Sequence, residues 1–134
     1  MLGDLIYEAT GKRTARRVLS AEASGFKVEV TFEESGKLLG ADATGFGTYW
    51  SGNRPDGTLY GEGQGVVLTK KGEMVTWKGQ GVGQIKAGGA VSYRGAVYYY
   101  TASKKLARLN KVAAVFEYEV DANGNTRTKE WEWK

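Results

Sequence analysis

The sequence predicts an all-β protein: a single antiparallel meander of about eight or nine strands, closed into a small barrel, with one short helix. Three observations support this class. Glycine is frequent, with 20 residues against one proline, and 12% of the chain is aromatic. Apolar and polar residues alternate in several segments, as in half-buried strands. Short turns separate these segments, and closure removes the exposed edges that an open sheet this long would leave.

The first strands follow from alternation and turn residues. We expect one bent strand, or a tight hairpin about Gly11, within 5–19, and a half-buried strand over 26–32. The triplet at 34–36, Glu-Ser-Gly, is interpreted as the turn that ends this strand. Residues 37–50 are expected to form one longer strand, kinked at its glycines, before the Pro-Asp-Gly turn at 55–57.

The second half repeats this pattern with one interruption. Strands are expected at 58–69, 73–86, 90–101, 112–120 and 127–133, and Asn123-Gly124 is a strong hairpin signal. Between Ser103 and Leu109 the apolar spacing becomes helical, which predicts one or two turns of helix. The 134 residues suit one domain, 1–134, and an orthogonal β-sandwich is the alternative architecture.

Two neighbouring strands carry glycine at every second position, Gly61/Gly63/Gly65 and Gly79/Gly81/Gly83. Because side chains alternate across a strand, each run removes the side chains of one face. Both glycine faces are expected to point inward. They serve either close packing and strand coiling or the wall of a ligand cavity. If a cavity exists, its expected aromatic lining is Trp77, Tyr93, Tyr99, Phe116 and Trp131.

Two charged residues are further candidates for the site. Arg94 is expected either to pair with a carboxylate such as Glu8, Glu62 or Glu117 or to anchor an anionic ligand. Glu62, Arg94 or a tyrosine are also the groups expected to transfer protons or stabilise charge if the barrel is an isomerase or cyclase. The main expectation is a non-enzymatic barrel that binds a small apolar or aromatic ligand.

Several function classes are disfavoured by composition. The chain has no histidine and no cysteine, which removes the usual general base, the commonest metal ligand and any disulfide. The glycine spacing does not fit GxGxxG or a phosphate loop. We therefore expect no metal and no cofactor. Without a signal peptide or a long apolar run, a cytoplasmic location away from the membrane is expected.

Possible partners follow from two surface features. Strand 90–101 is apolar on both faces, which suggests that the helix at 103–109 or a second subunit covers its outside; a homo-oligomer is one expectation. Basic residues cluster at 13–17 and 104–111. Such clusters are usually solvated surface, so nucleic-acid binding is a minor alternative.

Three phrases carry a family resemblance: GTYWSGNRPDGTLYGEGQGV (47–66), VSYRGAVYYYT (91–101) and KLARLNKVAAVFEYEVDANGNT (105–126). Together they resemble a family of small, uncharacterised prokaryotic β-barrel proteins, and a family without a known activity implies none here. In architecture the chain is similar to calycin and allene-oxide-cyclase-like barrels. That resemblance implies an interior that binds or cyclises small apolar molecules.

Overall fold

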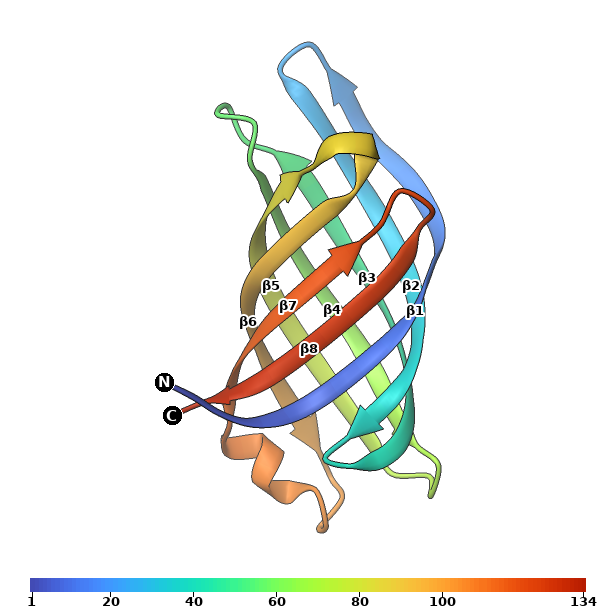
Figure 1. The fold of residues 1–134 in the computed structure, drawn as a ribbon, viewed down its shortest axis with the longest axis vertical. Helices are drawn as coiled ribbons and strands as arrows, with labels where there is room; N and C mark the ends of the chain where they lie inside the picture. Colours follow the sequence, from blue (N-terminus) through green and yellow to red (C-terminus); the bar gives the residue numbers. More distant parts are fainter.

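The computed structural model describes all residues from 1 to 134 and is a closed barrel of eight antiparallel strands in meander order (Figure 1). The predicted fold class is therefore confirmed, with eight strands and no sandwich. The strands are β1 Leu2–Glu22, β2 Gly25–Leu38, β3 Ala41–Asn53, β4 Leu59–Thr69, β5 Met74–Ile85, β6 Val91–Thr101, β7 Ala113–Val120 and β8 Asn125–Trp133.

Closure depends on the first strand, which pairs with β2 on one side and with β8 on the other. Tyr7 lies opposite Leu38 of β2 and Glu130 of β8. The chain runs through Gly11 as one 21-residue strand, so the hairpin considered for this segment does not form. Irregularities on either side of Leu5 shift the β1–β8 register, which sets the face that each β8 side chain occupies.

The turn residues of the β2–β3 hairpin correct one predicted boundary. Residues 37–50 are not one strand, because the chain reverses at Leu39 and Gly40, which have φ of 48° and 84°. Positive φ favours glycine, so Gly40 serves a turn here and not a kink. Residues 34–36 do not form a turn, and β2 continues through Glu34 to Leu38. Glu34 therefore lies inside a strand.

The predicted helix is present only as a short 3₁₀ segment, η2 Ala107–Lys111. It lies at the lower end of the barrel in Figure 1. Leu106 and Leu109 are buried there in the core and close this end. A second 3₁₀ turn, η1 Ala87–Gly89, joins β5 to β6. The helical segment thus closes one end of the barrel. It does not cover Tyr98 and Tyr100 on the outer face of β6, which are 56% and 64% exposed.

The interior packs as two clusters. The lower one contains 12 buried residues, among them Ile6, Val75 and Leu109, and the upper one contains five. The upper cluster is rich in aromatic rings, with Phe32 and Tyr118 5.4 Å apart between ring centroids. Trp77 and Phe116 pack against both clusters. Both rings also line the interior space that these clusters leave unfilled.

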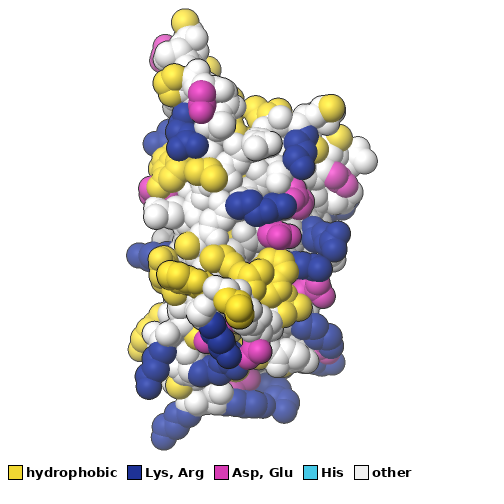
Figure 2. Space-filling model, turned by 60° about the vertical axis from the view of Figure 1, so that its left-hand side comes forward, with side chains coloured by type: hydrophobic (Ala, Val, Ile, Leu, Met, Phe, Trp, Pro, Cys, Tyr) yellow, Lys and Arg dark blue, Asp and Glu magenta, His cyan; other side chains and the backbone are white.

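The outer surface is mixed, and hydrophobic side chains gather on part of the face shown in Figure 2, with lysines and arginines around them. Whether a second subunit covers the exposed tyrosines of β6 stays a prediction. No helical segment of the chain has the length and apolar character needed to cross a membrane.

Candidate functional site

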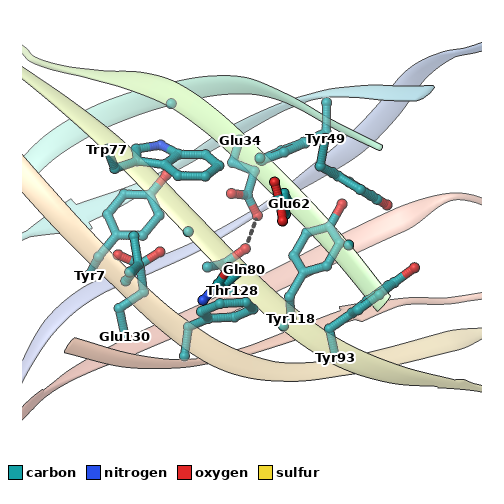
Figure 3. Close-up of a pocket in the computed structure, with 18 of the residues that line it drawn as sticks. Tyr7, Glu34, Tyr49, Glu62, Trp77, Gln80, Tyr93, Tyr118, Thr128 and Glu130 are labelled. Atoms are coloured by element: carbon teal, nitrogen blue, oxygen red, sulfur yellow. Dashed lines mark hydrogen bonds between the residues drawn. The ribbon is translucent and has the colours of Figure 1, made fainter. Parts of the chain in front are cut away.

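A cavity of about 70 Å³ lies inside the barrel between the two core clusters. Its lining combines aromatic rings with three carboxyl groups, of which Glu34 and Glu130 are buried, and Figure 3 shows these side chains around the central space. The main inward-facing groups are Tyr7, Phe32, Glu34, Tyr49, Trp77, Tyr93, Phe116, Tyr118, Thr128 and Glu130.

One wall of the cavity carries no side chains. Gly61 lies opposite Gly81, and Gly63 lies opposite Gly79, so a block of four glycines faces inward across β4 and β5. A Cβ at Gly79 or Gly81 would lie 2.9 or 2.8 Å from a carbonyl oxygen of β6. These glycines therefore permit close strand approach, and they also leave the wall bare.

Other glycines of the same wall make room for the Trp77 indole. A Cβ at Gly65 would lie 2.5 Å from the ring, and one at Gly47 would lie 2.8 Å from it. Gly65 is the cross-strand neighbour of both Trp77 and Gly47, so the indole lies over two glycines. The alternating glycines thus serve packing in part, and the volume that packing leaves is the cavity.

The Glu34 side chain enters the cavity from β2 because every second residue of the strand faces inward, and Val30 and Phe32 precede it at this spacing. Its Oε2 accepts hydrogen bonds from the hydroxyls of Thr128 at 2.6 Å and Thr126 at 3.2 Å (Figure 3 marks the first). Burial raises the pKa of Glu34 to about 7, and the two hydroxyl hydrogen bonds limit the rise. At neutral pH this carboxyl is thus near its midpoint.

Glu130 is the second interior carboxyl, from β8. The Tyr99 hydroxyl donates a 2.5 Å hydrogen bond to its Oε1. Burial raises the pKa of Glu130 to about 7; the Tyr99 hydrogen bond lowers it and the neighbouring Glu34 raises it. The charge of Glu34 therefore disfavours ionisation of Glu130.

Tyr7 completes the polar side of the cavity. Its hydroxyl is buried and has no hydrogen-bond partner, as is true of Tyr118. Burial raises the pKa of Tyr7, and Glu34 and Glu130 raise it further, so the hydroxyl stays protonated and free to donate. A Cβ at Gly45 would lie 2.5 Å from this oxygen, so glycine is needed beside it.

Tyr7→Phe is expected to raise the free energy of unfolding by about 1 kcal/mol, because it removes a buried hydroxyl that has no partner. Tyr93→Phe is the matched control. It breaks a buried 2.6 Å hydrogen bond with Ser51 and should lower stability by about 1 kcal/mol. Urea denaturation of both variants measures the difference. A loss in Tyr7→Phe equal to that in Tyr93→Phe would show that the Tyr7 hydroxyl is already satisfied.

The structure brings together only part of the site expected from sequence. Trp77, Tyr93 and Phe116 line the cavity. Tyr99 is buried next to it and acts on it through Glu130. Trp131 does not face inward: it is half-buried on the outer face, opposite Val115 and the exposed Leu5, since the β1–β8 register turns Glu130 to the interior instead.

The two charged candidates also lie outside. Arg94 projects from the outer face of β6 and pairs with Glu119 at 2.9 Å and Glu117 at 3.9 Å. Of the two roles expected for Arg94, ion pairing is therefore the one that the structure shows. The ion pairs lie on the surface, away from the cavity. Glu62 is exposed and accepts a 2.7 Å hydrogen bond from the Tyr60 hydroxyl. It is nevertheless one of the residues that line the cavity, together with the inward-facing glycines of β4 and β5.

Glu34 and Glu130 were not predicted to lie in the cavity, although the alternation of inward and outward residues along their strands could have located them. Glu34 follows Val30 and Phe32 at steps of two, and Glu130 follows Thr126 and Thr128 in the same way. Extending each strand by one inward position predicts both carboxyls. No group of three or more acidic, histidine or cysteine side chains is placed to hold a metal ion.

These features define a class: an eight-stranded antiparallel barrel with a partly polar interior cavity. No known protein family matches the sequence, and no curated protein matches it. Solved structures do share the fold. A protein of unknown function from Clostridium acetobutylicum has a TM-score of 0.84 at 12% identity, with 98% of each chain covered. A conserved protein of unknown function from Rhodopseudomonas palustris has 0.79 at 13%, covering 99% of each.

An enzyme from Penicillium herquei is a third neighbour, with a TM-score of 0.70 at 18% identity, covering 98% of this chain and 96% of its own. At such identities the similarity establishes the fold alone. The resemblance to uncharacterised prokaryotic barrel proteins is confirmed at that level.

Proposed function

We propose that the barrel binds one small molecule in this cavity, with an apolar or aromatic body against Trp77, Phe32 and Phe116 and a polar group held by Glu34, Glu130 and Tyr7. The observation that carries the proposal is the set of polar groups turned toward an interior space. The Tyr7 hydroxyl has no partner in the chain, and both carboxyls are buried. The unpartnered Tyr7 hydroxyl destabilises the fold unless something occupies the space and bonds to it, whereas the carboxyls already accept hydrogen bonds within the chain and can accept others.

The size of the cavity limits the ligand. A dry cavity of about 150 Å³ takes up benzene, and this one is about 70 Å³. A molecule of a few heavy atoms therefore fits directly. A single aromatic ring fits if one of the tyrosines above the cavity moves. Tyr49, Tyr93 and Tyr118 form that layer, with ring centroids 5.6 to 6.1 Å apart.

Phenol and toluene test the proposal, because they have similar size and differ in the hydroxyl. We expect phenol to raise the melting temperature with concentration, as a ligand of the folded state does, and toluene to raise it less. In the double variant Glu34→Gln/Tyr7→Phe, phenol should raise the melting temperature no more than toluene does. An equal response to both compounds, or none to either, contradicts the proposal.

A second candidate is acid–base catalysis of the isomerase or cyclase type. The observation that favours it is two carboxyls with pKa near neutrality beside one cavity, where one can donate a proton while the other accepts. Acetone, a four-heavy-atom ketone that fits the cavity, separates the two functions. Exchange of its methyl protons in D₂O, lost in the Glu34→Gln variant, indicates catalysis; binding without exchange indicates a binding protein.

A further inference from the structure

The β1–β2 hairpin extends beyond the rest of the barrel at its upper end (Figure 1). The β1–β8 pairing stops at Lys12 and Asn125, while the β1–β2 pairing continues to Glu22 and Gly25. The Arg13 N–H still donates to the Gly124 carbonyl at 2.8 Å, and beyond it residues 14–22 pair with β2 only. This overhang lies at the upper end of the barrel, which we call the mouth, next to the layer formed by Tyr49, Tyr93 and Tyr118.

Two arginines of the overhang are on its inner face. Arg13 lies opposite Phe32, and Arg16 lies opposite Val30. Directly opposed residues of an antiparallel pair share a face, and Phe32 and Val30 are buried in the interior. Both arginines are therefore on the side of the barrel axis. A Cβ at Gly124, in the β7–β8 turn, would lie 3.6 Å from Nη2 of Arg13, which places that guanidinium over the upper end.

The charge of these arginines acts on the tyrosine layer. Burial raises the pKa of Tyr49, and Arg13 and Arg16 both oppose the rise. Their guanidinium groups are thus close enough to interact with the hydroxyl of a residue that also lines the cavity. Tyr49 is thus the cavity-lining residue on which the charge of both arginines acts.

Neither arginine has a carboxylate partner. Their neighbour Arg17 points to the outer face and pairs with Glu29 at 3.3 Å, and Arg94 and Arg108 are also paired with carboxylates. Asp121, in the β7–β8 turn, accepts hydrogen bonds from Asn123 and Asn125 of its own turn. The inner side of the mouth therefore carries uncompensated positive charge.

Resting on the proposed function, we infer that the ligand carries a carboxylate, which Arg13 and Arg16 bind at the mouth while its apolar body enters the cavity. Guanidinium groups bind carboxylates through paired N–H donors, and two of them beside one opening favour an anionic ligand over a neutral one of the same shape. The ligand class is then a small aromatic or apolar carboxylic acid.

The test compares 3-phenylpropionate with its neutral amide, 3-phenylpropanamide, by isothermal titration. We expect wild-type protein to bind the acid about tenfold more tightly or better, as hydrogen bonds to charged groups allow. In Arg13→Gln/Arg16→Gln the two compounds should bind equally, with the amide affinity unchanged. Arg17→Gln, on the same strand but facing outward, should keep the preference.

The titrations distinguish carboxylate recognition at Arg13 and Arg16 from ligand binding in the cavity. Equal binding of acid and amide to the wild type, or a preference that survives the double substitution, overturns the inference and leaves the binding function standing. Binding of neither compound counts against both.

Discussion

Glu130→Gln is expected to stabilise the protein at pH 8 and to change its stability little at pH 4. The folded-state pKa of Glu130 is raised from 4.5 to about 7. Between these values the folded protein holds a proton that the unfolded chain has released, so the free energy of unfolding falls as pH rises through this window. The difference corresponds to about 3 kcal/mol for one carboxyl, and glutamine, which does not ionise, avoids much of it.

Urea denaturation of wild type and Glu130→Gln from pH 4 to pH 8 measures this effect. We expect a gain of about 1–3 kcal/mol above pH 7, since glutamine keeps an oxygen that can accept from Tyr99. Glu62→Gln is the matched control, because Glu62 is exposed, and it should show no such pH-dependent gain. The same gain at pH 4 and pH 8 would mean that ionisation of Glu130 is not the cause.

Trp77→Ala is expected to lower the free energy of unfolding by about 3–5 kcal/mol, the usual cost of removing a large ring from a core. The indole lies over Gly47 and Gly65, so nothing on that wall can fill the space it leaves. The same space should then bind free indole. Added indole should recover part of the lost stability in proportion to its concentration.

Trp133→Ala is the control for this substitution, because Trp133 is 63% exposed. We expect a change within about 0.5 kcal/mol and no response to indole, as for a typical surface site. Chemical denaturation with and without indole checks both variants. If Trp77→Ala costs no more than Trp133→Ala, Trp77 does not support the interior as described.

Local patterns in the sequence predicted the barrel. Alternation over 26–32, the Asn123-Gly124 turn and the paired glycine strands each depend on neighbouring residues, and the structure has a strand, a hairpin and an inward glycine face at these places. The short helix was also located, although as a 3₁₀ turn that closes one end. These features follow from propensity and period alone.

The polar half of the site depended on long-range pairing. In 127–133, hydrophobicity favours Trp131 as the inward residue, yet Glu130 occupies that position because β8 must pair with β1, more than 100 residues earlier in the chain, across an irregular register. Glu34 stands in a sequence typical of a turn and becomes interior only because β2 continues to Leu38. Alternation along each strand locates Glu34 and Glu130 only once the extent of β2 and the register of β8 are known.

Two carboxyls inside the barrel, Glu34 and Glu130, are expected to titrate near neutrality around the cavity. The most direct test is an NMR titration of the side-chain carboxyl carbons of Glu34 and Glu130 in the intact protein. We expect both to titrate with apparent midpoints near pH 7, well above the 4.5 of an unperturbed glutamate, with a shift in both when phenol binds. Midpoints near 4.5, with no response to phenol, would contradict the account.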